Sequence, residues 1–163
     1  MEPSDADSEW VSLCLGRRPQ SRWCVAARDG DGRPSVIEND PFLDDGTPMP
    51  TRFWLVDRSL SRRVGTLEAA GGVDRAEVEL GLAEIGRIHD AAAAERDQRI
   101  GPDHVGPRPS GGVGGTRRGV KCLHAHLAAH LAGVDDAVGR WVARELAEQL
   151  DSDADLTATP TRP

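Results

Sequence analysis

The chain has 163 residues, with 20 basic residues against 27 acidic ones and a formal net charge of −7 at pH 7. That length suits one domain with tails, and the acidic balance argues against duplex DNA as the main partner. No apolar stretch approaches the roughly 20 residues of a membrane span, and the acidic N-terminus does not resemble a signal peptide. Three cysteines cannot form a closed set of disulfides, so the sequence predicts a reduced, cytoplasmic protein with no membrane or DNA partner.

The first half of the chain predicts a small antiparallel sheet after a tail. Residues 1–9 are acidic with little apolar content and are predicted to be disordered. Short apolar runs at 23–28, 34–38 and 53–56 predict three strands, because β-branched and aromatic residues favour a pleated surface. Alternating Asp and Gly at 29–32 predicts the turn of a hairpin between the first two strands.

The apolar period changes after Asp57 and predicts helices. The first predicted helix ends at Gly71 and Gly72. The second begins at Asp74, its predicted cap, and runs to Arg96 on a single apolar stripe. Two more are predicted over about 121–132 and 136–150, with a single domain over 10–150 and a second disordered tail over 151–163. We therefore predict an α+β fold, in which a small N-terminal antiparallel sheet packs with about four helices. The stripe of the second helix comprises Val78, Leu82, Ile85, His89 and Ala92.

Residues 104–134 form a cationic segment inside this acidic chain. They contain no acidic residue but hold four of the five histidines and Lys121, the only lysine. A glycine-rich loop that leads into a helix offers backbone N–H groups and a favourable dipole to an anion such as phosphate. The loop is not a P-loop, because the lysine follows one residue late and no apolar strand precedes it. A plain linker is the alternative. The candidate anion-binding residues are Gly114, Gly115, Arg117, Arg118 and Lys121.

The same segment continues into a dense group of cysteine and histidine. Cys122, His124 and His126 are residue types that bind metals or perform nucleophilic and acid–base catalysis. On a regular helix Cys122 and His126 share a stripe while His124 falls outside it. If the chain is extended up to His124, Cys122 and His124 instead lie on one side, and His126 can join them from the first turn. A buried thiol with hydrogen-bonded histidines is the alternative.

Several stretches also resemble a known family, the bacterial domain-of-unknown-function family 501 of high-GC Gram-positive bacteria. The resemblance covers about residues 15–147 and implies no particular activity. It implies cysteines in many members where this chain has Asp29 and, in some, Asp57, so both aspartates join the candidate metal ligands. Its genes often neighbour those of a septum-formation initiator and an exopolyphosphatase-like enzyme. The resembling stretches are 36–39, 45–57, 67–72, 112–126 and 138–142, with 119–126 the most specific.

Two hypotheses about function follow. The favoured one is a compact site for a small phosphate-like anion, a divalent metal such as zinc, or both. In an enzyme, Cys122 or a metal-bound water is the nucleophile and His124 or His126 the base. The rival hypothesis is a non-enzymatic interaction or structural protein linked to cell division, in which the Cys/His segment is structural and the partner is another protein.

Overall fold

The computed structural model describes the backbone of residues 1–157 and the side chains of residues 1–150. Its sheet has three antiparallel strands in the order β1 (Trp23–Arg28), β2 (Pro34–Asn39) and β3 (Phe53–Leu55). The Asp29 carboxylate accepts hydrogen bonds from the backbone N–H groups of Asp31 and Arg33, which closes the hairpin between β1 and β2. The three predicted strands and their hairpin are therefore confirmed.

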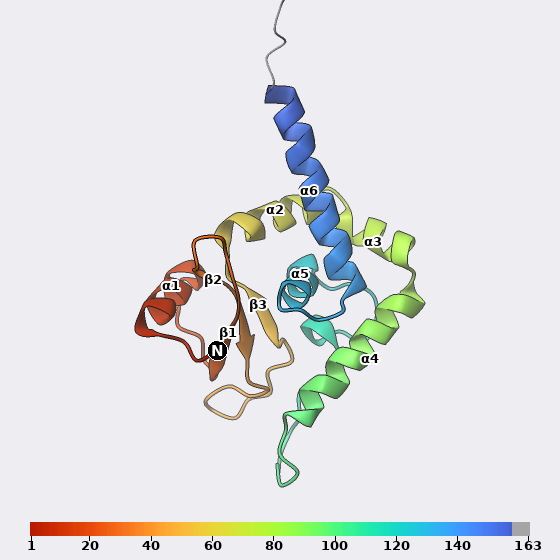
Figure 1. Ribbon diagram of the computed structural model, residues 1–163. Coiled ribbons are helices and arrows are strands. Elements are labelled where there is room, and N and C mark those ends of the chain that lie inside the picture. Colours follow the sequence, from red (N-terminus) through yellow and green to blue (C-terminus); the bar gives the residue numbers. More distant parts are fainter. Residues whose placement is uncertain (158–163) are drawn as a thin grey trace, which may run out of the picture.

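The helices that follow the sheet pack around α5. This helix lies between the sheet on one side and α3, α4 and α6 on the other (Figure 1). The α+β class is confirmed, but the described chain has six α-helices rather than about four. After α1, described below, they are α2 (Arg58–Ala69), α3 (Gly72–Leu80), α4 (Leu82–Gln98), α5 (Leu123–Leu131) and α6 (Ala137–Thr157), with a short 3-10 turn η1 at Val113–Gly115.

Helix α1 (Asp5–Leu15) replaces much of the predicted N-terminal tail. Ser4 and Asp7 form a capping box, in which each side chain bonds the other residue's backbone N–H. The Asp7 carboxylate also pairs with Arg28 of β1 at 2.7 Å, and this guanidinium holds the pKa of Asp7 well below its usual range. The prediction of disorder over 1–9 is wrong, because acidic residues in a first helical turn stabilise the helix dipole.

Replacing Asp7 by alanine is expected to lower the free energy of unfolding by about 1–2 kcal/mol, since it removes both the cap and the ion pair. Chemical denaturation at pH 7 measures this loss. The pKa of Asp7 is lower in the folded chain, so its contribution is present above the ordinary Asp pKa and disappears as the pH falls below it. Asp5→Ala is the matched control, because Asp5 is exposed and forms neither contact; an equal loss in both variants would contradict the prediction.

The second predicted helix is divided in two at Gly81. This glycine has φ +79° and ends α3, and α4 starts at Leu82 and runs in another direction (Figure 1). The predicted single stripe is therefore wrong at the break, where Val78 is 86 % exposed. Asp74 does not cap the helix either, because α3 begins two residues earlier with Gly71 at the N-cap.

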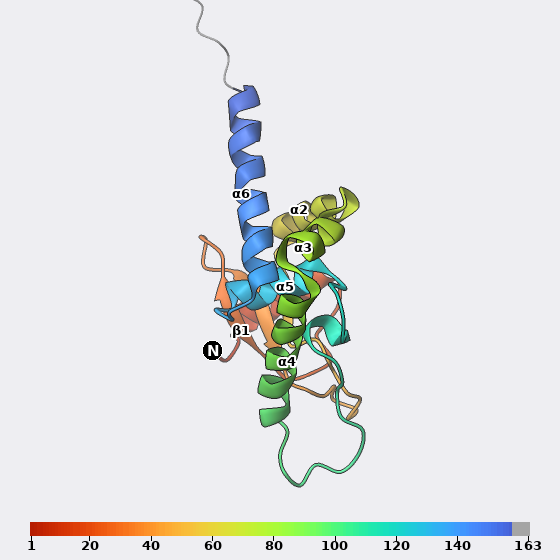
Figure 2. The same ribbon diagram turned by 90° about the vertical axis from the view of Figure 1, so that its right-hand side faces the viewer.

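Two apolar clusters hold the elements in place. The larger one joins α2 through α6 and includes Leu67, Leu123 and Trp141. The smaller one packs α1 on the sheet through Val11, Ile37 and other side chains. Helix α6 continues beyond the body of the fold to Thr157 (Figure 2), so residues 151–157 are helical where a tail was predicted, and 158–163 lie outside the described residues. None of the described helices has the length and apolar character needed to cross a membrane.

Candidate metal centre

The start of α5 places Cys122 and His124 side by side. Cys122 is the N-cap residue with extended backbone angles (φ −161°, ψ 128°), and the helix begins at Leu123. The chain is therefore extended up to Cys122 but not up to His124. At this junction the side chains of Cys122 and His124 still meet, whereas His126 turns away into the core.

A third side chain, Glu68, comes from the last turn of α2. Its carboxylate accepts a hydrogen bond from the Leu123 backbone N–H at 2.6 Å and lies 3.3 Å from His124 Nδ1. The close approach depends on Gly72, because a Cβ there would lie 2.6 Å from the Leu67 carbonyl and 3.1 Å from the Leu123 side chain. Helix α2 thus delivers a carboxylate to the first turn of α5.

Glu68, Cys122 and His124 form a three-ligand group. One ligand atom from each, a carboxylate oxygen, Sγ and a ring nitrogen, lies within 4.8 Å of the others, and all three residues are half-buried. Around tetrahedral zinc, bonds of about 2.0–2.3 Å put neighbouring ligand atoms roughly 3.3–3.8 Å apart. The 3.3 Å between His124 Nδ1 and Glu68 Oε1 already matches that spacing. The group therefore has the residue types and the size of a zinc site.

Helix α2 also fixes the orientation of the His124 ring. The His124 Nε2–H donates a hydrogen bond to the Ser61 carbonyl at 2.9 Å. This leaves Nδ1 on the side of Glu68 and Cys122. Metal-binding histidines are commonly held in this way, by a backbone carbonyl or carboxylate on the nitrogen that does not bind the metal.

The electrostatics of the pair favour a negatively charged sulfur. Burial raises the pKa of the Cys122 thiol, but the His124 imidazole and the Ala125 backbone N–H lower it further, so the pKa lies below its ordinary value. The Cys122 side chain and the Ser61 carbonyl raise the pKa of His124 to about 9, against an opposing effect of burial. In the metal-free protein at neutral pH, His124 is therefore an imidazolium, and it stabilises the thiolate form of Cys122 relative to an ordinary cysteine.

In the metal-free protein at pH 7, Cys122 is expected to react with iodoacetamide faster than Cys14, because thiolate is the reactive form and burial raises the pKa of Cys14. His124→Gln should slow the reaction, because it removes the imidazole that lowers the pKa of the Cys122 thiol. Lys121→Met is the control: its Nζ donates to the Gly114 carbonyl at 3.2 Å. Mass-spectrometric rates at each cysteine measure this. An inert Cys122, or equal slowing by both variants, would contradict the assignment.

The other predicted metal ligands lie elsewhere. His126 is buried in the core, and its Nδ1 pairs with the buried Asp136 carboxylate at 2.8 Å. Asp29 closes the hairpin as described, and Asp57 caps α2 by accepting hydrogen bonds from the N–H groups of Ser59 and Leu60. Among the described residues, the structure does not bring these three side chains into the group of Cys122 and His124.

The glycine-rich loop is anchored to its neighbours. Arg96 donates to the Gly111 carbonyl, and His89 bonds the loop at both ring nitrogens, to the Val113 N–H and the Gly119 carbonyl. His89, a residue of the predicted apolar stripe, is therefore buried with a hydrogen-bond partner at each ring nitrogen.

The protein's own carboxylates occupy two backbone N–H groups where the glycine-rich loop leads into α5. Glu77 accepts from the Val120 N–H at 2.7 Å, and Glu68 accepts from the Leu123 N–H. Of the side chains proposed to bind an anion, Lys121 donates to Gly114, and Arg117 and Arg118 are exposed. A free anion at these N–H groups would meet two carboxylates, so the geometry favours a cation here.

Sequence reasoning missed Glu68 as a ligand. Ser61 and Glu68 are seven residues apart, two helical turns, so they lie on the same face of the predicted helix. That spacing does not indicate which segment they face, and the Ser61 group that bonds His124 is a backbone carbonyl, which no sequence pattern marks.

Together these features define an α+β protein with a Glu/Cys/His group where the last turn of one helix meets the start of another. The chain belongs to the family described as protein of unknown function (DUF501), whose family model matches residues 25–144. This range contains all three residues of the group and confirms the resemblance seen in the sequence. No curated protein and no solved structure matches the chain.

Proposed function

We propose that the protein binds a divalent metal ion, zinc, through Glu68, Cys122 and His124. The observation that carries the proposal is the His124 ring, whose Nε2–H is held by the Ser61 carbonyl while Nδ1 faces the other two ligands. Zinc accepts this mixture of carboxylate, thiolate and imidazole. The thiolate and the carboxylate together balance the charge of the ion.

The site is of the open kind. Structural zinc sites are closed by four protein ligands, whereas catalytic sites use three and leave a position for water or substrate. Only these three ligand residues converge among the described residues, and all of them are half-buried rather than enclosed. A bound zinc would lower the pKa of a water in the remaining position and supply a nucleophile near neutral pH. This supports an enzyme over the purely structural alternative.

The surroundings favour an anionic substrate at that position. Arg117, Arg118 and Lys121 are exposed and precede Cys122 by at most five residues. Exposed cations near a site raise the local concentration of anions and their rate of association. The predicted anion is therefore proposed as a ligand of the metal rather than of the loop N–H groups.

Titration of the metal-free full chain with Zn²⁺, in competition with a chromogenic chelator, tests the proposal. We expect one ion per chain, and at least about 100-fold weaker binding in Cys122→Ser and in Glu68→Gln, because each removes a ligand. Cys24→Ser and Glu77→Gln are matched controls outside the group and should keep the affinity. Equal affinity in all four variants would place the zinc elsewhere and refute the proposal.

A further inference from the structure

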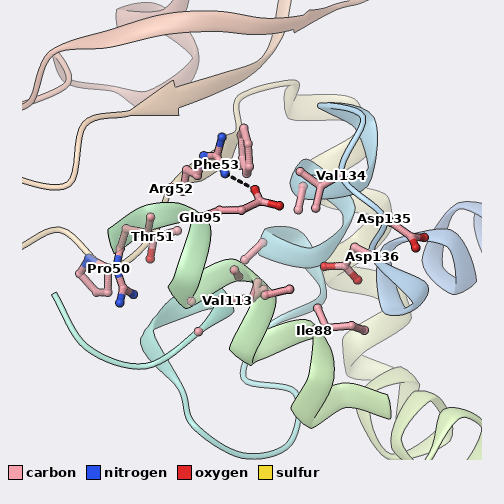
Figure 3. Close-up of a pocket in the computed structure, with 17 residues that line it drawn as sticks. Pro50, Thr51, Arg52, Phe53, Ile88, Glu95, Val113, Val134, Asp135 and Asp136 are labelled. Atoms are coloured by element: carbon pink, nitrogen blue, oxygen red, sulfur yellow. Dashed lines mark hydrogen bonds and ion pairs between the residues drawn. The ribbon is translucent and has the colours of Figure 1, made fainter. Parts of the chain in front are cut away.

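A cavity separate from the metal centre lies between α4, α5 and the strand β3 (Figure 3). Its enclosed space is about 50 Å³. An apolar cavity of about 150 Å³ holds benzene, so this space suits a hydrocarbon group of roughly two or three carbons. Glu68, Cys122 and His124 do not line it, and its walls are largely apolar: Phe53, Ile88, Ala92, Val113, Ala125 and Ala129.

Two arginines line this apolar space. Arg96 is only 4 % exposed and is held by Asp97 and the Gly111 carbonyl. Arg52 lines the cavity beside Glu95, to which its Nη1 donates at 2.6 Å (Figure 3). Its Nε donates to Glu38 at 2.7 Å, and the guanidinium lies 4.7 Å from the centre of the Phe53 ring. Arg52 therefore stays in position if Glu95 leaves.

Two hydrogen-bond donors of the residues that line the cavity are unused. Among the described residues, neither Arg52 Nη2 nor the Thr51 hydroxyl has a hydrogen-bond partner. The lining carboxylates are already engaged: Asp136 pairs with His126, Asp135 pairs with Arg140, and Glu95 pairs with Arg52. Of these, Glu95 is 49 % exposed at its side chain and can turn into solvent at low cost. Apolar walls beside unused donors are suited to an apolar molecule with an acidic group.

We propose that this cavity binds a small organic acid of about four carbons. Its hydrocarbon part lies against the alanines of α4 and α5, and its carboxylate takes the place of Glu95 on Arg52. An arginine–carboxylate pair is a charge-assisted hydrogen bond and is stronger than one to a neutral oxygen. This site does not depend on the proposed zinc, because the two share no residue.

Binding of isobutyrate to the full chain, measured by ligand-observed NMR, tests the proposal against two probes of similar shape. Isobutanol lacks the charge and isobutylamine reverses it. We expect isobutyrate to bind at least about tenfold more tightly than either probe, because only the acid forms a charged pair with Arg52. Equal binding of isobutanol would show an apolar cavity without acid recognition, and tighter binding of isobutylamine would show that the carboxylates dominate. Either result overturns the proposal.

Variants of the lining residues then locate the binding. Glu95→Gln removes the competing carboxylate and should strengthen isobutyrate binding by about threefold or more. Ala92→Leu fills the space and should abolish binding, and Arg52→Gln should weaken it about tenfold. Glu84→Gln, an acidic residue of α4 outside the cavity, is the control and should change nothing. Circular dichroism confirms that each variant is folded. Weaker binding in Glu95→Gln, or unchanged binding in folded Ala92→Leu, would refute the assignment.

Discussion

Replacing Trp141 by alanine is expected to lower the free energy of unfolding by about 3–5 kcal/mol, the largest loss we expect from a single substitution in this chain. Trp141 is 2 % exposed and belongs to the larger apolar cluster. Its Nε1–H donates to the Glu79 carboxylate at 2.8 Å, and the Arg75 guanidinium lies 5.6 Å from the ring centre. The indole thus fixes α6 to α3, and its removal leaves a cavity that the surrounding helices cannot fill.

Denaturant unfolding of the full chain, followed by circular dichroism, measures this loss. Trp141→Phe keeps most of the apolar contact and loses the hydrogen bond to Glu79, so we expect an intermediate effect of about 1–2 kcal/mol. Leu150→Ala on the same helix is the control: Leu150 is 54 % exposed, and its replacement should cost less than about 0.5 kcal/mol. A loss below about 1 kcal/mol for Trp141→Ala would mean that the indole is not an anchor of the core.

Zinc affinity is expected to rise by at least about 100-fold between pH 6 and pH 8. The pKa of His124 is raised to about 9 in the metal-free protein, so its Nδ1 carries a proton throughout this range. A metal must displace that proton, and the apparent affinity falls tenfold for each pH unit below the pKa of the displaced group. Because the pKa of His124 is raised, protons compete more strongly with zinc for Nδ1, and zinc affinity falls as the pH falls.

Calorimetric titrations with Zn²⁺ at pH 7, in buffers with different enthalpies of ionisation, count the protons released. We expect at least one proton per ion bound. The same shift affects folding in the opposite sense when no metal is present: the stability from protonated His124 is complete below its ordinary pKa of about 6.5 and is lost as the pH rises through about 9. Affinity that does not change with pH would show that Nδ1 of His124 is not a ligand.

The local elements of this fold are readable from the sequence. The three strands and their hairpin follow from short apolar runs and an Asp/Gly turn, which depend on residues close together in the chain. Helices α2, α5 and α6 follow from a regular apolar period in the same way. The prediction from sequence was wrong at the N-terminus, where the same short pattern is typical of two different structures. Acidic residues before Trp10 indicate either disorder or a capped first turn, and only the contact with Arg28 of β1 distinguishes them.

The candidate site shows the same division between local and distant information. The sequence by itself singled out Cys122, His124 and His126 as a Cys/His group, but it left open which of them lie together, because that depends on where the helix begins. Only the tertiary structure decided that Glu68 completes the group and that His126 leaves it for Asp136. The physical reason is packing: burial of Leu67 and Leu123 in one core brings the end of α2 onto the start of α5. A contact between residues more than fifty positions apart is set by the burial of many side chains together, which the residues of the site do not encode.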